Sequence, residues 1–134
     1  MSLGFNPDEF QVSQLAEVIH DPYMAKRLVF SLKTRTVSST GQQSSSISTS
    51  ETTGIVESNP YIPDNLLKSV FPEGDVSREV VKVFIIDSLS FTLKNGCFLD
   101  VYKDSTHLGN FKVNFVQRNM AIPEFVISYC VSSR

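Results

Sequence analysis

Residues 80–98 read VVKVFIIDSLSFTLKNGCF, and this stretch decides the fold class of the chain. Its first seven residues are nearly all β-branched or aromatic, as expected of a strand that is covered on both faces. Residues 88–93 then alternate polar with apolar, which is the period of a half-buried strand. Asn95-Gly96 supplies the two positive-φ positions of a type I′ turn. The stretch therefore predicts a strand followed by a hairpin in which Leu93 pairs with Phe98.

Downstream of this stretch, the pattern predicts two more strands. A polar turn signal at residues 104–107 leads into residues 108–116, and Pro123 precedes a last alternating run at 125–131. Strands joined by turns this short must be antiparallel to each other. We expect the core of the protein to lie in a sheet over residues 79–132, centred on these large apolar side chains: Phe84, Phe91, Phe111 and Ile127.

Upstream, the sequence predicts two helices. Asn6-Pro7-Asp8-Glu9 is a helix start, and the helix from residue 7 to about 20 carries an apolar stripe formed by Val12, Leu15, Val18 and Ile19. A short helix is expected over 64–71, where Leu66, Leu67, Val70 and Phe71 share one side. The predicted fold is α+β: an antiparallel, meandering β-sheet of about six strands with an N-terminal helix and one short helix, in a single domain covering residues 1–134.

A Ser/Thr-rich tract at residues 36–54 admits two interpretations. Residues 27–37 alternate like a strand, and residues 36–53 then hold 12 Ser or Thr among 18. Such a composition is typical of a flexible linker or loop, because it buries too little apolar surface to offset the entropy of ordering. The alternative is a long hairpin with a type II′ turn at Gly41-Gln42, in which Thr36 opposes Ile47. The sequence leaves both interpretations open.

Composition and charge restrict the possible partners and location. The formal charge of −2 comes from 12 basic and 14 acidic residues spread along the chain, which argues against nucleic acid or an anionic membrane as the main partner. No apolar run reaches the length of a membrane span, and residues 1–20 lack the pattern of a signal peptide. We expect a cytoplasmic protein, or one built into a particle that assembles in the cytoplasm. Cys97 and Cys130 are accordingly expected to be free thiols.

Motifs for catalysis or cofactor binding are missing from the sequence. His20 and His107 have no second ligand at metal-binding spacing, and no phosphate-binding loop, dinucleotide fingerprint or nucleophile elbow occurs. In the predicted hairpin Asp100 opposes Phe91 and is a carboxylate on an otherwise apolar face, where a hydrogen bond to a neighbour or exposure to solvent explains it better than general-base chemistry. We expect no enzyme activity, no cofactor and no metal.

The remaining features favour a structural or assembly protein that acts through protein contacts. The only basic cluster consists of Lys26, Arg27, Lys33 and Arg35. An ordered two-stranded arm is marginal alone in water, so it implies a partner, such as a second copy in a homo-oligomer or a larger assembly. The residues expected to make the contact are Lys33, Arg35, Val37 and Ile47.

Arms of this kind also occur in self-assembling viral and phage particles, an analogy of architecture alone. The second hypothesis is a monomeric adaptor or regulatory module, whose Ser/Thr-rich tract is a flexible linker open to phosphorylation.

Overall fold

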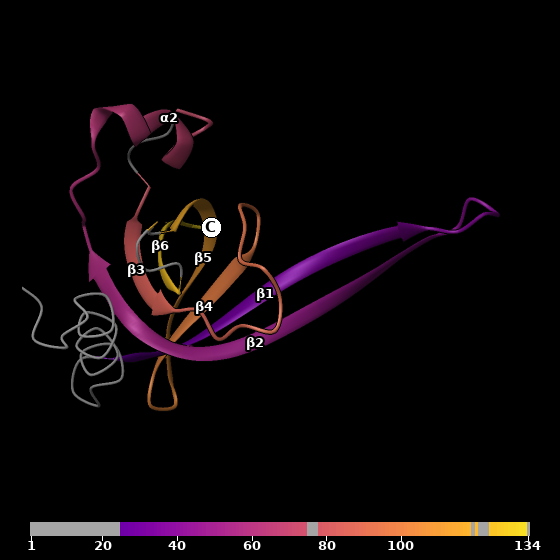
Figure 1. Cartoon of the computed structure of the whole chain (residues 1–134), viewed down its shortest axis with the longest axis horizontal. Helices are drawn as coiled ribbons and strands as arrows, with labels where there is room; N and C mark the ends of the chain where they lie inside the picture. Colours follow the sequence, from indigo (N-terminus) through magenta and orange to yellow (C-terminus); the bar gives the residue numbers. More distant parts are fainter. Residues whose placement is uncertain (1–24, 75–77, 119, 121–123, 134) are drawn as a thin grey trace, which may run out of the picture.

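The computed structural model describes residues 25–74, 78–118, 120 and 124–133. Six antiparallel strands close into a barrel in the order β1-β2-β3-β6-β5-β4, because β4 pairs back onto β1 (Figure 1). The antiparallel sheet of six strands is thus confirmed, whereas the expected N-terminal helix lies outside the described residues. The strands are β1 (Lys26–Val37), β2 (Gln43–Ser58), β3 (Val80–Ile86), β4 (Phe98–Lys103), β5 (Thr106–Arg118) and β6 (Phe125–Ser132).

The interior of the barrel is filled by the apolar positions of the alternating strands. Every strand contributes: Leu28 and Phe30 of β1 are fully buried, and β3 contributes Val83 and Ile85. Gly54 of β2 lies where the packing leaves no room for a side chain, since a Cβ there would come within 2.5 Å of the Phe84 carbonyl oxygen. The other buried members of this core are Val81, Leu93, Cys97, Leu99, Val101, Phe111, Val113, Val126 and Cys130.

The strand order corrects the expected meander. Strands β1 to β3 follow one another around the wall, and so do β4 to β6, but β3 lies beside β6 and β4 beside β1. After Ile86 both edges of β3 are occupied, by β2 and by β6. The chain must therefore cross to another place in the wall before it can pair again.

The expected hairpin around Asn95-Gly96 is wrong for the same reason. Residues 87–97 are the crossing connection, and β4 pairs with β1 and β5 instead of with residues 88–93. The turn itself is present, with Gly96 at φ +97°. The polar–apolar alternation arises because Leu93 is buried, and Leu89 and Phe91 pack against the barrel core, while the residues between them face outward.

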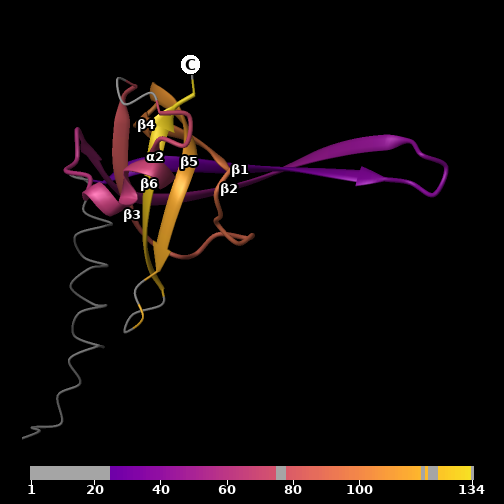
Figure 2. The same ribbon diagram turned by 90° about the horizontal axis from the view of Figure 1, so that it is seen from above.

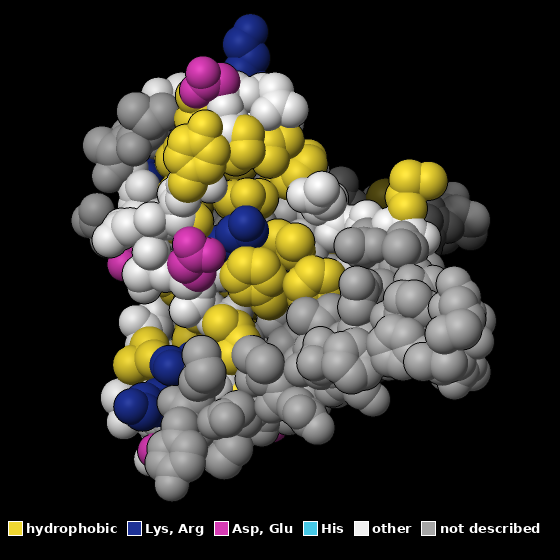
Figure 3. Space-filling model, turned by 60° about the vertical axis from the view of Figure 1, so that its left-hand side comes forward, with side chains coloured by type: hydrophobic (Ala, Val, Ile, Leu, Met, Phe, Trp, Pro, Cys, Tyr) yellow, Lys and Arg dark blue, Asp and Glu magenta, His cyan; other side chains and the backbone are white. Residues whose placement is uncertain are grey.

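A second, smaller core lies outside the barrel. The predicted short helix is confirmed as a 3-10 turn, η1 (Asp64–Leu66), followed by α2 (Leu67–Val70). Val70 and Phe71 pack there against the outer side chains of β3 and β6, namely Val80, Tyr129 and Val131. Hydrophobic side chains gather on this side of the molecule (Figure 3).

The four residues expected at the centre of the core divide between these environments. Phe111 is buried inside the barrel, as predicted. Phe84 and Ile127 point outward from β3 and β6 and stay partly exposed, and Phe91 is partly exposed in the crossing connection. The near-continuous apolar run of β3 therefore reflects apolar surroundings on both faces of that strand.

Candidate interaction surface

The hairpin interpretation of the Ser/Thr-rich tract holds, because β1 and β2 form one continuous antiparallel ladder from Lys26–Gly54 to Val37–Gln43. The distal part of this hairpin projects far from the barrel, and both views show it standing alone (Figure 1, Figure 2). Every residue from Lys33 to Thr49 is exposed. We call this segment, residues 33–49, the arm.

The register of the hairpin differs from the expected one by three residues. Opposing residues sum to 80, as in Leu28–Thr52, rather than to 83. The reason is a wider turn: the Ser38 backbone N–H donates to the Gln42 carbonyl at 2.8 Å, and Gly41 takes φ +84° inside the loop. The Ser38 hydroxyl also accepts from the Gln42 N–H at 3.2 Å, which stabilises this five-residue turn.

The corrected register places all four predicted interaction residues on one face of the arm. Lys33 opposes Ile47, and directly paired residues of an antiparallel ladder point to the same side. Arg35 and Val37 lie two and four residues further along β1, so they share that side. An odd shift of register moves a side chain to the opposite face, which is why Ile47 joins this set and leaves the face of Thr36.

The two faces of the arm have different chemistry. The face of Lys33, Arg35, Val37 and Ile47 also includes Gln43 and Ser45, which the sequence interpretation missed because it used the wrong register. Val37 and Ile47 are 65% and 67% exposed, so this cation–aliphatic face holds two of the large exposed apolar side chains among the described residues. The opposite, hydroxyl face carries Thr34, Thr36, Ser44, Ser46 and Ser48, and the Thr36 and Ser44 hydroxyls lie 2.6 Å apart.

The arm has a charge opposite to that of the rest of the chain. Lys33 and Arg35 are its only charged residues, so the arm carries +2, while the whole chain carries −2 and the remainder −4. The other two members of the basic cluster are placed elsewhere, since Lys26 and Arg27 belong to the barrel part of β1. The basic cluster is thus divided between two sites.

The base of the arm is held by contacts to the barrel. Arg27 donates to the Glu51 carboxylate at 2.9 Å and stacks over the Tyr102 ring at 4.2 Å. The crossing connection also binds β2 here, because the Ser90 backbone N–H donates to the Ser50 hydroxyl at 3.1 Å. These contacts hold the part of the hairpin next to the arm in a fixed position on the barrel, and we call this part, around Arg27 and Glu51, the root of the arm.

Asp100 lies on the outer surface of β4 and is hydrogen-bonded to its neighbours. It accepts from the Asn110 side-chain amide at 2.9 Å, and its carboxylate lies 2.9 Å from Nε2 of His107. The His107 ring contacts Tyr102 edge-on, with 5.0 Å between ring centroids. The register places Asp100 beside Val29 and Asn110, not opposite Phe91 as expected. His20 lies outside the described residues.

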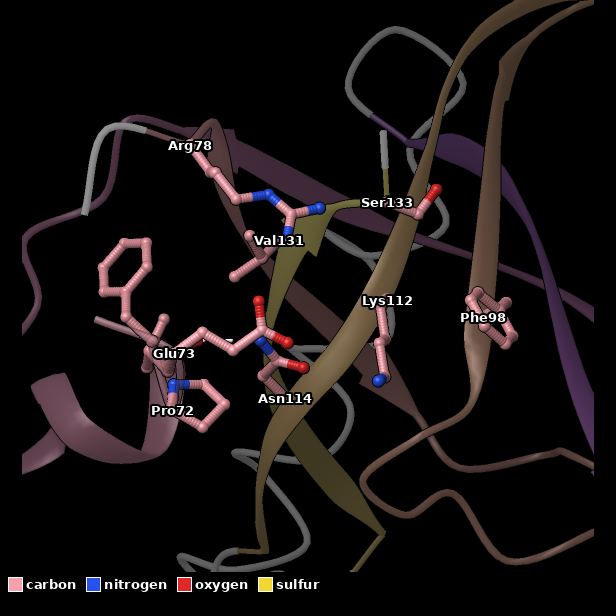
Figure 4. A pocket seen from close by; sticks show the side chains of 10 residues that line it. Pro72, Glu73, Arg78, Phe98, Lys112, Asn114, Val131 and Ser133 are labelled. Atoms are coloured by element: carbon pink, nitrogen blue, oxygen red, sulfur yellow. Dashed lines mark hydrogen bonds between the residues drawn. The ribbon is translucent and has the colours of Figure 1, made fainter. Parts of the chain in front are cut away.

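A groove of about 280 Å³ lies between α2 and the wall formed by β5 and β6. Figure 4 shows Glu73, Arg78 and Lys112 around its opening. Asn114 donates from its side-chain amide to the Val70 carbonyl at 2.8 Å, which fixes the end of α2 to β5. The groove is therefore a seam between two packed elements, with charges of both signs at its rim.

Both cysteines are buried and free of disulfide bonds. Burial raises the pKa of the Cys130 thiol to about 12. Two smaller effects act on the same pKa: the hydrogen bond with the Ser128 hydroxyl lowers it, and the nearby Cys97 raises it. The thiol therefore stays protonated at neutral pH and is a poor nucleophile.

Among the described residues, no three His, Cys, Asp or Glu side chains gather in a group that could hold a metal ion. None of the helices in that part of the chain has the length and apolar character of a membrane span. Comparison with models of protein families and with curated protein sequences finds no match for this chain.

Proposed function

We propose that this protein is a non-enzymatic assembly protein that associates with copies of itself, or docks into a larger protein complex, through the arm. The observation that supports this most is the exposure of the whole segment from Lys33 to Thr49, on both faces of the ladder. The barrel needs none of these side chains for its core. An exposed segment of this length that is nevertheless paired strand to strand suits a contact surface for another protein.

Physical chemistry supports an external partner for the arm. An isolated two-stranded ribbon is marginally stable in water, and a contact that covers one of its faces stabilises it. The cation–aliphatic face offers both kinds of contact, since Val37 and Ile47 can lose water at an interface and Lys33 and Arg35 can bind acidic side chains. The proposed partner is therefore a protein. Arms of this kind also join the subunits of viral and phage particles, and we propose that this chain assembles in the cytoplasm.

The test is to shorten the arm without touching the barrel. Leu32 and Ser48 face each other in the ladder, so an Asn-Gly turn between them can replace residues 33–47. We expect the melting temperature of the shortened chain to stay within a few degrees of the unaltered one, because no buried residue is removed. Light scattering after size-exclusion chromatography should show concentration-dependent oligomers for the unaltered chain and a monomer for the shortened chain.

A matched variant keeps the arm at full length and changes only its contact face. Val37→Ser with Ile47→Ser leaves the ladder in place and removes the two exposed aliphatic side chains. This variant should weaken association without changing the melting temperature. If the unaltered chain stays monomeric over a hundredfold range of concentration, self-association is wrong, and the monomeric adaptor with phosphorylated hydroxyls becomes the better proposal.

A further inference from the structure

The arm has two open strand edges. Strand β1 pairs with β4 only over Arg27–Ser31, and β2 pairs with β3 only over Ile55–Ser58. Beyond these limits, β1 from residue 32 to 37 and β2 from residue 43 to 49 pair only with each other within the described part of the chain. Strand β5 also has open stretches in that part, since it pairs with β4 only over Thr106–Lys112 and with β6 only over Phe111–Arg118, but the arm is open on both of its sides at once.

The backbone groups that point outward from these edges follow from the ladder. The Ser38 N–H donates to Gln42 across the turn, so the pairs that bond within the hairpin are the even-numbered ones, such as Thr36–Ser44. The odd-numbered residues direct their N–H and C=O groups away from the hairpin. In the arm these residues are Lys33, Arg35 and Val37 on one edge, and Gln43, Ser45, Ile47 and Thr49 on the other.

An identical arm supplies what both edges lack. Two arms that lie side by side and point the same way place β2 of one against β1 of the other, and these strands run in opposite directions, as an antiparallel ladder needs. We propose that neighbouring copies of this chain pair edge to edge through their arms, β2 of one copy with β1 of the next. This inference rests on the proposed function, because it names the partner and the bonds of the same arm.

The arm carries few of the features that usually prevent such pairing. Natural proteins block exposed edges with proline, with bulges or with charges that interfere with an approaching strand. The arm contains no proline and its ladder runs without a register shift, and although Lys33 and Arg35 lie on the β1 edge, the β2 edge carries no charge. Because each contact joins two different edges, repetition of the contact gives a ring or an open chain of copies rather than a closed dimer.

The charges of the arm give this arrangement a recognisable salt dependence. Neighbouring arms are about 10 Å apart when each contributes two strands, which is close to the screening length in about 0.1 M salt. Lys33 and Arg35 of adjacent copies then repel each other on the same face, so added salt should strengthen association. A cationic arm that binds an acidic surface should instead bind more weakly as salt is added.

The decisive variant is Ser45→Pro in the full-length chain. It removes an outward N–H and leaves the hairpin's own bonds intact, because Ser45 belongs to a pair that does not bond within the hairpin. We expect its association constant to fall about tenfold or more, whereas Ser45→Ala, which keeps the N–H, should change it less than about threefold. Circular dichroism and thermal unfolding of both variants check that the barrel is unchanged.

Cross-linking gives the geometry of the contact. One preparation carries Arg35→Cys and another carries Ser45→Cys, each as a single change, and the native thiols are buried. Mixing the two under mild oxidation should give a disulfide dimer that contains one copy of each. Dimers formed by the Ser45→Cys chain alone would mean that β2 pairs with β2, which would overturn the proposed order of strands.

The outcomes separate this inference from the proposed function. If Ser45→Pro associates like the unaltered chain while Val37→Ser with Ile47→Ser does not, the arm acts through its side-chain face and the edge pairing is wrong. If the shortened arm also associates normally, the proposed function itself fails. Edge pairing is established if Ser45→Pro loses association, Ser45→Ala keeps it, and the mixed disulfide forms.

Discussion

The arm continues two of the six barrel strands, β1 and β2, and the side chains along these two strands change where the barrel ends. In the barrel part of β1 the inward positions are Leu28 and Phe30, both fully buried, and in the arm the same side of the strand carries Thr34 and Thr36, both exposed. The backbone ladder passes through the boundary without a register shift. The comparison shows that strand pairing sets how far a hairpin extends, while the apolar side chains set where the core ends.

The largest expected effect comes from truncating one residue in each region of the hairpin. Phe30→Ala should destabilise the protein by about 3 to 5 kcal/mol, because its ring is fully buried in the barrel core. Ile47→Ala should cost less than about 0.5 kcal/mol, since that side chain is exposed on the arm. Urea denaturation of monomeric samples measures both. A cost above about 1 kcal/mol for Ile47→Ala would mean that the arm stabilises the barrel.

A glycine in each region sharpens the same comparison. Gly54→Ala should cost about 1 to 3 kcal/mol, because the new Cβ would meet the Phe84 carbonyl oxygen and the Leu28 side chain. Gly41→Ala has open space around its Cβ but keeps a positive φ, so it should strain only the turn at the tip. The melting temperature should therefore fall for Gly54→Ala and stay unchanged for Gly41→Ala. Equal melting temperatures would contradict the tight packing at the root of the arm.

The buried thiol predicts a pH dependence that belongs to the barrel alone. Burial raises the pKa of Cys130 from 9.0 to about 12, so the folded protein holds a proton that the unfolded chain releases above pH 9. The stabilisation is fully present below pH 9 and is lost as the pH rises toward 12. The slope of the unfolding free energy against pH is proportional to the number of protons released on unfolding. Between pH 9 and 11, Cys130→Ala should lower that number by about one. An unchanged slope would place that thiol in contact with water.

The smallest effect is expected at the ion pair where the two regions meet. Arg27 and Glu51 lie 2.9 Å apart, but their side chains are 39% and 56% exposed. Glu51→Gln should therefore cost less than about 1 kcal/mol, and added salt should reduce the difference further. Chemical denaturation at two salt concentrations is the measurement. A larger cost would show that the root of the arm depends on this pair for its position.

The sequence predicted the elements better than their connections. The runs at 80–86 and 125–131 are strands, and a short helix begins at Asp64. The turn predicted at residues 104–107 occupies only 104–105, because β5 already begins at Thr106. These elements depend on local side-chain patterns. The crossing connection failed because Leu89, Phe91 and Leu93 alternate for a different reason: they pack against the barrel core from a segment that pairs with no strand.

The sequence singled out the four proposed contact residues but did not predict the face that they share. The cationic and aliphatic residues stood out in the sequence because they lie in or next to a tract that consists mainly of Ser and Thr. Their common face depends on a register set by the turn at residues 38–42 and by the packing around Gly54, and neither can be read from alternation alone. A closed barrel likewise depends on pairing between distant strands, such as β1 with β4.

The wide turn at the tip has a consequence for how far the arm can reach. The root of the hairpin is fixed at Leu28 and Gly54, whereas the turn at residues 38–42 touches nothing but itself among the described contacts. Adding one residue on each side of the turn would lengthen the arm by about 3.4 Å, and adding two would repeat the same face. In the proposed assembly, insertions at this one site would change the spacing between copies and leave the barrel as it is.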